Sequence, residues 1–399
     1  MQKIIPEVEA FARIKVVGAG GSGKNATNHM INSKVKGVEF IAINTDAQDL
    51  HHSLAKKKIH IGKNLTRGLG TGMNPDLGKR AAEETREEIQ ESLKGADMIF
   101  IAGGLGGGTF SGAGPVIAKI ARELGALTVA VVTRPFSFEG AQRLQVAEQA
   151  LEELRREVDA IIIIPNDRLL AIVEKETTLT NAFSICDEVL RNAVEGISDL
   201  ITTPGIINVD FADIRSIMKN AGAALMGIGA AGGDDRAVVA AKAAINSPLL
   251  DLSITGAKGV LFAIAGGEDL RMAEVQEAAR VITEAIDPNA RVIFGAIKDP
   301  KVKKNEIKIT VIASGFPELQ GQSSTLFKNQ EAEAPARENT QQNTQAPAGK
   351  GKIYNSLPKD NKPVADIKRA APSQPEQTKN NNNDDDDWGV VPAFLRRKK

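Results

Sequence analysis

Cysteine, histidine and long apolar runs are scarce in this chain of 399 residues. Cys186 is the only cysteine, so it cannot form an internal disulfide, and it shows no metal-ligand spacing with the four histidines. We therefore expect the protein to reside in a reducing compartment. We do not expect its side chains to form a metal site. The N-terminal sequence lacks a secretory apolar segment, and no run of about 18 apolar residues occurs. A cytosolic location is expected.

Net charge is also absent, because 50 Lys and Arg residues balance 50 Asp and Glu residues. This balance removes the electrostatic argument for nucleic-acid binding. Hydrophobic residues make up 42% and charged residues 25% of the chain, as in soluble globular proteins. The length predicts two compact domains and a non-globular remainder.

Short β-rich runs alternate with helical stretches in the first part of the chain. The predicted strands are 14–17, 40–43, 98–102, 128–132 and 160–164. Alternation of this kind predicts an α/β fold with a Rossmann-like parallel sheet, whose ligands bind at the carboxyl ends of the strands. Gly-rich turns follow several of these strands.

A long helix is predicted over about 180–201. Its apolar residues recur every three or four positions, as a core-facing helix requires: Phe183, Cys186, Leu190, Val194, Ile197 and Ile201. After a turn at 203–205, a helix following Glu268 and β-like runs at 292–297 and 307–313 predict a smaller α+β domain. Beyond Pro317 the composition is polar and predicts disorder.

The first strand runs into a glycine-rich segment, Gly18 to Asn25, that allows three interpretations. The segment fits the dinucleotide fingerprint G-x-G-x-x-G, with Asp46 at a suitable distance for a ribose contact. It also nearly fits a P-loop, but Asn25 stands where a magnesium-binding hydroxyl is required. Glycines at a tight strand-to-helix turn without any ligand are the third interpretation.

A second glycine-rich segment, 102–112, follows another predicted strand and leads into a helix predicted at Pro115. Glycines allow backbone N–H groups to approach phosphate oxygens, and the helix that follows adds its positive end. The two glycine-rich segments would contact one phosphate chain from two sides. Neither a Rossmann site nor a P-loop requires the second segment. A third stretch, 68–72, suits a loop that senses a terminal phosphate.

Several longer motifs carry a family resemblance: AINTDAQ (42–48), TRPFSFEG (133–140), IPNDRLL (164–170) and NVDFADIRSIM (208–218). Over residues 12–317 the chain resembles the FtsZ family of bacterial tubulin homologues, which are GTPases. The resemblance implies GTP or GDP as ligand, with Mg²⁺ bound mainly through the phosphates. It implies nucleotide contacts at Gly20, Gly21, Ser22, Gly23, Lys24, Asn25, Gly104, Gly107, Gly108, Thr109, Phe110, Glu139, Arg143, Asn166, Phe183 and Asp187.

Among these residues Asp187 favours guanine, because a carboxylate accepts from the ring N–H and the exocyclic amine together. Without the surrounding motifs it would be interpreted as a solvated surface acid. Two positions depart from the family pattern. Phe110 replaces a signature glycine and adds bulk, so altered GTP affinity or turnover is expected. Lys24 stands where relatives often have Gly or Asn, and we hypothesise that it adds positive charge near the phosphates.

The candidate catalytic residues are Asn208, Asp210 and Asp213, which follow the long helix. The two carboxylates could orient and activate a water for attack on a γ-phosphate. In the simpler interpretation, Asp213 caps a helix that starts near Ile214. A helix of about 22 residues extends about 33 Å, so acids beyond its end cannot reach the nucleotide that Asp187 contacts. They would act on the nucleotide of a neighbouring subunit, and that contact propagates into filaments.

An acidic run, an apolar peptide and a basic end follow one another in the last residues of the sequence, from Asp384 to Lys399. The peptide resembles the C-terminal segment of the FtsZ family, through which membrane-anchored division proteins bind. The resemblance implies partner contacts at Val391, Pro392, Phe394, Leu395 and Arg396. The terminal cations could contact anionic lipid only weakly.

The predicted organisation follows the chain in order: an N-terminal extension (1–11), a GTP-binding domain (12–178), a central helix (179–202), a catalytic loop with its helix (203–222), an α+β domain (223–317), a disordered linker (318–383) and a partner-binding peptide (384–399). The predicted function is a GTPase that polymerises head to tail at the bacterial division site. The alternatives are a NAD-dependent oxidoreductase and a GTP-dependent polymer with little turnover because of Phe110.

Overall fold

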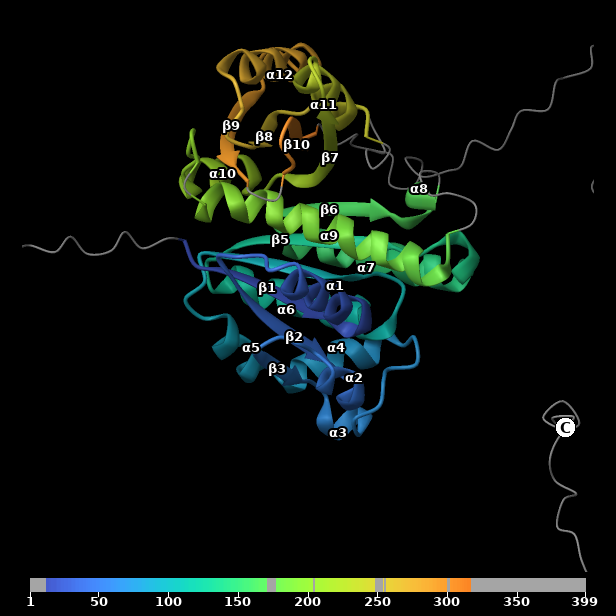
Figure 1. Cartoon of the computed structure of the whole chain (residues 1–399). Helices are drawn as coiled ribbons and strands as arrows, with labels where there is room; N and C mark the ends of the chain where they lie inside the picture. The colour runs from blue at the N-terminus through green and yellow to red at the C-terminus, as the bar shows by residue number, and fades with distance from the viewer. Residues whose placement is uncertain are drawn as a thin grey trace, which may run out of the picture. The chain divides into compact units, whose positions relative to one another are not determined.

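The structure is a computed structural model that describes residues 12–170, 177–203, 205–247, 254, 256–299 and 302–316. The predicted linker and C-terminal peptide lie outside the described residues. All elements described below belong to one compact unit. Their arrangement is shown in Figure 1.

Ten strands form one sheet in the order β3-β2-β1-β4-β5-β6-β7-β10-β8-β9. Their bounds are β1 Ile14–Ala19, β2 Val38–Asn44, β3 Lys57–His60, β4 Met98–Gly104, β5 Leu127–Arg134, β6 Ala160–Pro165, β7 Gly222–Gly232, β8 Gly259–Gly266, β9 Arg291–Lys298 and β10 Glu306–Ser314. The strands from β3 to β7 are parallel, and β10 runs antiparallel to β7 and β8. The predicted fold class is confirmed.

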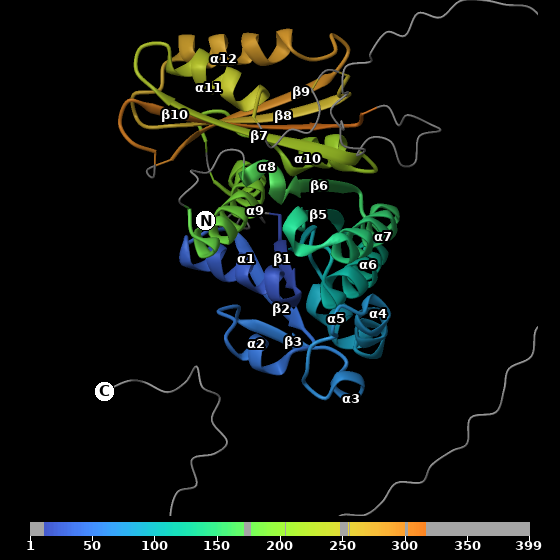
Figure 2. The same ribbon diagram turned by 90° about the vertical axis from the view of Figure 1, so that its right-hand side faces the viewer.

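Helices cover both faces of the parallel part of the sheet. Those of the first part are α1 Gly20–Asn32, α2 Ala47–His51, α3 Lys63–Thr66, α4 Pro75–Glu84, α5 Arg86–Leu93, α6 Gly108–Glu123, α7 Ala141–Glu157 and α8 Asn166–Leu170, with a 3-10 turn η1 at Ser137–Glu139. Figure 2 shows α1 on one side of the sheet with α9 (Leu179–Thr202), and α4 to α7 on the other. Each face therefore carries its own core.

Strand β4 illustrates how the sequence builds these two cores. Met98 and Phe100 are buried with α9 on one face, whereas Ile99 and Ile101 are buried with α6 on the other. Side chains of a strand alternate between the faces of its sheet. A strand covered on both faces is therefore apolar at every position, as this one is.

The predicted long helix is α9, which spans 24 residues and extends about 36 Å. Cys186, Leu190, Val194 and Ile197 lie in the core as predicted. Phe183 does not, because its side chain is 41% exposed.

The remaining helices are α10 Phe211–Met218, α11 Arg236–Ile245 and α12 Met272–Glu284. Helices α11 and α12 pack on the C-terminal strands around a separate apolar cluster. Strand β7 joins this part to the parallel strands through three residue pairs with β6. Ahead of α10, Ile207 forms a single antiparallel bridge with Ala296 of the edge strand β9.

Candidate nucleotide site

Two helices begin at the carboxyl ends of adjacent strands, α1 at Gly20 after β1 and α6 at Gly108 after β4. Neither helix has a capping side chain or an acidic residue in its first turn. Their first N–H groups therefore remain available to an anion, and the helix dipoles favour negative charge at the same place. This arrangement is suited to a phosphate chain.

A cavity of about 320 Å³ opens between these helix ends. Of the predicted nucleotide residues, its lining contains Gly20, Gly21, Ser22, Asn25, Gly104, Gly107, Gly108, Thr109, Phe110, Glu139, Arg143, Asn166, Phe183 and Asp187. The fold therefore brings together residues that lie far apart in the sequence. Their individual contacts with a nucleotide stay a prediction.

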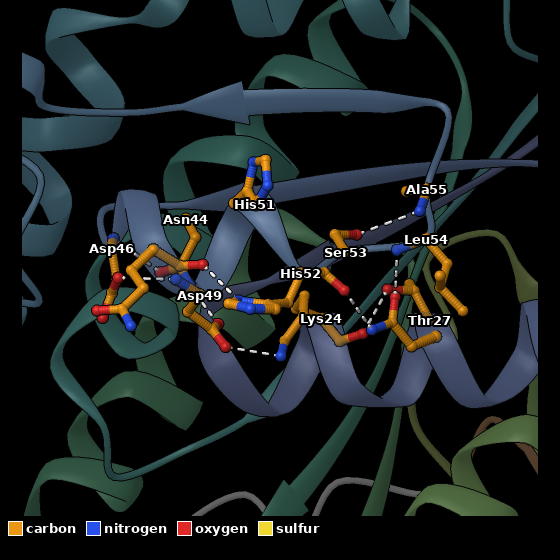
Figure 3. A network of polar contacts seen from close by, with 12 residues as sticks. Lys24, Thr27, Asn44, Asp46, Asp49, His51, His52, Ser53, Leu54 and Ala55 are labelled. Carbon is orange, nitrogen blue, oxygen red and sulfur yellow. Dashed lines mark hydrogen bonds and ion pairs between the residues drawn. The ribbon is translucent and has the colours of Figure 1, made fainter.

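Gly23 and Lys24 are not among the lining residues. A Cβ at Gly23 would lie 2.5 Å from the carbonyl oxygen of Ala102, so this glycine allows α1 to pack against β4. Lys24 points toward α2, where its Nζ lies 2.6 Å from Oδ1 of Asp49 (Figure 3). The side chain of Lys24 is thus directed to a carboxylate and not into the cavity, although its charge also acts on Asp187.

Hydrogen bonds connect the three glycine-rich stretches. Ser22 Oγ accepts from the N–H of Gly104 at 2.7 Å, which joins the first stretch to the second. The hydroxyl of Thr109 lies 2.8 Å from that of Thr45 and 3.4 Å from that of Thr71. The third stretch therefore contacts the beginning of α6 directly.

The far end of the cavity combines an aromatic surface with two polar groups. Phe183 packs edge-on against Phe136, with ring centroids 5.4 Å apart. Oδ1 of Asn166 is buried and has no hydrogen-bond partner. Burial raises the pKa of Asp187 to about 6, although His29 and Lys24 act in the opposite direction. An unpartnered amide and a carboxylate that lacks solvation both gain from a ligand that supplies N–H donors.

Glu139 and Arg143 also line the cavity. Glu139 Oε1 accepts from the N–H of Phe136 at 3.0 Å, and its Oε2 accepts from the guanidinium of Arg143. The ion pair holds the Arg143 guanidinium beside the cavity.

Sequence reasoning missed five lining residues: Leu105, Thr133, Pro135, Cys186 and Leu190. Thr133 and Pro135 belong to the motif TRPFSFEG at the end of β5, and position at a strand end could have identified them. Cys186 and Leu190 were assigned only to the core because their spacing fits a buried helix face. Burial, aided by the charge of Asp187, raises the pKa of the Cys186 thiol to about 12, so the thiol stays protonated at neutral pH.

The ring of Phe110 is buried, although its backbone lies at the cavity. Its ring atoms are the nearest neighbours of Gly103 and Gly114. The ring therefore lies in the core, and the expected change in GTP affinity or turnover stays a prediction. Helix α6, which contains Phe110, begins at Gly108, seven residues before the predicted start, and Pro115 lies inside it.

Asn208, Asp210 and Asp213 lie beyond the C-terminal end of α9, and none of them lines the cavity. Asn208 Oδ1 accepts from the N–H of Gly205 at 2.7 Å. Asp210 is the N-cap of α10 and accepts from the N–H of Ala212 at 3.0 Å. The suggested cap Asp213 is instead in the first turn, because the helix begins at Phe211, three residues before the predicted start.

No group of three or more His, Cys, Asp or Glu side chains could hold a metal ion within the described ranges. The helices of those ranges also include none with the length and apolarity required to cross a bilayer.

Both parts of the chain match models of known families. Residues 13–174 match the GTPase domain of the tubulin/FtsZ family, and residues 222–317 match the C-terminal domain of the FtsZ family. The fold and the glycine-lined cavity are thus those of a tubulin-like GTPase.

Solved structures agree with this class. An FtsZ dimer from M. jannaschii is 46% identical, with a TM-score of 0.74, and the match covers 77% of this chain and 89% of that one. CetZ1 from Haloferax volcanii shares the fold at 21% identity and a TM-score of 0.67, over 77% of this chain and 96% of that one. The chain belongs to the tubulin/FtsZ family. A NAD-dependent oxidoreductase is not favoured.

Proposed function

We propose that this protein binds and hydrolyses GTP and polymerises head to tail, with hydrolysis completed by the acids of the adjacent subunit. The observation that carries the proposal is the position of Asp210 and Asp213. They follow one end of α9, whereas Phe183 and Asp187 lie in the cavity near its other end. About 23 Å of helix separates Asp187 from Thr202, and this separation supports action of the acids on the nucleotide of a neighbouring subunit.

The two ends of the cavity have different chemical tasks in this proposal. The N-termini of α1 and α6 hold the phosphates through backbone N–H groups. Asp187 and Asn166 recognise the base, since both can accept hydrogen bonds from the N–H groups of guanine, and adenine lacks this pair of donors. The ring of Phe183 offers a face or edge to the base.

Hydrolysis requires a water aligned with the γ-phosphate. Carboxylates supplied by Asp210 and Asp213 of one subunit would orient that water and accept its proton at the nucleotide of the next. Mg²⁺ would neutralise charge on the phosphates and would be held mainly by phosphate oxygens, because Asn25 takes the place of the P-loop hydroxyl.

Self-association is supported by the relatives. The M. jannaschii FtsZ structure is described as a dimer, and CetZ2 from Haloferax volcanii as a GTPγS-bound protofilament. A contact that joins the acid end of one subunit to the nucleotide end of the next is heterologous and therefore repeats along a filament.

We further propose that the filaments assemble in the cytoplasm at the bacterial division site. Val391, Pro392, Phe394, Leu395 and Arg396 would bind a membrane-anchoring division protein there, and residues 318–383 would connect this peptide to the rest of the chain. This part of the proposal rests on the sequence resemblance.

The test is phosphate release measured against protein concentration at saturating GTP, with sedimentation of the same samples. Assembly-coupled hydrolysis predicts a sharp onset of release at the concentration where pelleting begins. Release proportional to concentration from the lowest values, without pelleting, would contradict the proposal. GTP-dependent pelleting without release would indicate a polymer with little turnover.

A further inference from the structure

Lys24 occupies the position that carries the phosphate-binding lysine in a P-loop, yet its side chain is only 9% exposed and is paired with Asp49. Oδ1 of that carboxylate lies 2.6 Å from the ammonium group. A lysine held in this way has its charge balanced inside the protein. The first glycine-rich stretch therefore presents backbone N–H groups to the cavity without a lysine.

Asp49 has two further contacts that fix its position (Figure 3). Its Oδ2 accepts from Nδ2 of Asn44 at 2.8 Å, and its own N–H donates to Oδ1 of Asp46 at 2.9 Å. Asn44 Oδ1 in turn accepts from the N–H of Thr45 at 2.8 Å. The hydroxyl of Thr45 is the one that contacts Thr109. A continuous chain of contacts thus runs from Lys24 to the beginning of α6.

The carboxylate also lies close to the phosphate-binding end of α1. Oδ2 of Asp49 is 3.7 Å from the position that a Cβ would take at Gly21, a residue that lines the cavity. An unbalanced negative charge beside a residue that lines the candidate phosphate site would oppose phosphate binding, since like charges repel over several ångströms in a partly buried site. Lys24 is placed to cancel that charge.

We propose that Lys24 is a positioning residue that acts through Asp49 and does not contact the phosphates. It neutralises and holds the carboxylate beside Gly21, and so preserves both the electrostatics of the first phosphate loop and its connection to the second. This inference rests on the proposed function, because it concerns the binding of guanine nucleotide in the same cavity.

The experiment is a double-mutant cycle with Lys24→Met, Asp49→Asn and the double variant, using the full chain and a fluorescent GDP analogue. In the wild type the side chains at positions 24 and 49 have a summed charge of zero. Lys24→Met leaves the negative charge of Asp49, and the double variant has a summed charge of zero again. We expect Lys24→Met to weaken GDP binding about tenfold. The double variant should return to within about threefold of the wild type.

Measurements of KM and kcat for GTP distinguish a positioning role of Lys24 from a loss of folded protein. Lys24→Met should raise KM for GTP while kcat at saturating GTP remains within about twofold of the wild type. Lys58→Met is the matched control, because Nζ of Lys58 donates to the carbonyl oxygen of His51 at 2.9 Å and forms no ion pair with a carboxylate in the part of the chain that the structure describes. Its GDP affinity should not change.

A phosphate-binding lysine gives a different pattern. The double variant would then bind GDP as weakly as Lys24→Met, and this outcome would overturn the proposal. Urea unfolding of the wild type, the two single variants and the double variant, all without nucleotide, measures the coupling without a ligand. Additive effects of the two substitutions on the free energy of unfolding would also contradict the proposal. If the wild type did not bind GDP while urea unfolding still showed coupling between Lys24 and Asp49, the result would instead count against the proposed function.

Discussion

A methyl group at Gly103 would lie 2.2 Å from Cδ2 of Phe110. The phenyl ring therefore occupies space that exists only because residue 103 has no side chain. Gly114 borders the same ring, because a Cβ added at Gly114 would lie 3.4 Å from Cζ of Phe110. Phe110 replaces a glycine of the family signature, and its side chain is accommodated in the core between β4 and α6 and not in the cavity.

The first prediction follows from this packing. Phe110→Gly should destabilise the protein by about 4 kcal/mol, because it removes a buried ring and leaves a cavity. GTP turnover per folded molecule should not increase, since the ring does not obstruct the phosphate loop. Urea unfolding and phosphate release would measure the two effects.

The control for this prediction is the pair of variants at position 103. Gly103→Ala alone should destabilise by overpacking, whereas Gly103→Ala combined with Phe110→Gly should recover part of the stability. A rise in turnover for Phe110→Gly would show that the ring hinders the loop after all.

The second prediction concerns pH and Asp187. Its pKa is raised from 3.8 to about 6 by burial, so in the empty protein its ionisation lowers stability as pH rises between these values. Guanine needs the ionised carboxylate as an acceptor. GDP affinity should therefore fall about tenfold for each pH unit below 6.

Asp187→Asn supplies the comparison, because an amide has one acceptor oxygen and does not ionise. The variant should bind GDP weakly at every pH, with a flat profile between pH 5 and 7. A wild-type profile as flat as that of the variant would exclude Asp187 from base recognition.

The third prediction separates catalysis from helix capping. Asp213→Ala should retain GDP binding, lose most GTP hydrolysis and inhibit the wild type when the two are mixed, as expected for an active site shared between subunits. Asp210→Asn keeps an effective N-cap for α10 but removes the charge. It should also lose hydrolysis while its Tm stays close to that of the wild type. Full turnover by either variant would contradict the shared site.

The fourth prediction concerns the stability of the C-terminal part. Arg236 is 3% exposed, and its guanidinium contacts Asp269 at 2.6 Å and Glu274 at 2.7 Å. Hydrogen bonds from Arg236 lower the pKa of both carboxyl groups. The stability that they contribute is present at neutral pH and is lost as pH falls through those lowered values.

Arg236→Met should therefore lower Tm by several degrees at pH 7 and flatten the decline in Tm on acidification. Arg280→Met is a suitable control, because Arg280 and Glu284 are both 70% exposed and lie 3.9 Å apart. Thermal unfolding from pH 3 to 8 tests both. Equal effects of the two substitutions would show that burial of Arg236 is unimportant.

The sequence predicted the parallel sheet well because its buried strands are continuous apolar runs. It predicted neither β7 nor α11. Strand β7 reads GAALMGIGAAG, and its glycines and alanines have low β propensity. The strand exists because β10 pairs with it along nine residues, a tertiary effect that no local pattern reveals. The start of α6 was missed for a related reason, since glycines and Pro115 argue locally against a helix.

Most residues predicted as nucleotide contacts lie together around the cavity, although their contacts with a nucleotide stay a prediction. Five of the predicted lining residues are glycines at or just after the ends of β1 and β4, where the glycine-rich pattern itself indicates a site, and the other nine were implied by the family resemblance. Gly23 and Lys24 do not line the cavity, and Lys24 is the more informative of the two. Spacing places it in a P-loop pattern, but its partner Asp49 belongs to a different helix, and the sequence alone does not show which way a lysine turns.

The single bridge between Ile207 and Ala296 has a mechanical consequence. The N–H groups of Ile206 and Ile207 both donate to the carbonyl oxygen of Ala296, and Ala296 donates back to Ile207. Residues 206–207 are thus fastened to the outermost strand on one side and continue into Asn208 and Asp210 on the other. A displacement of β9 would therefore move the segment that leads into Asp210, so the edge strand of the sheet helps to set the position of this acid.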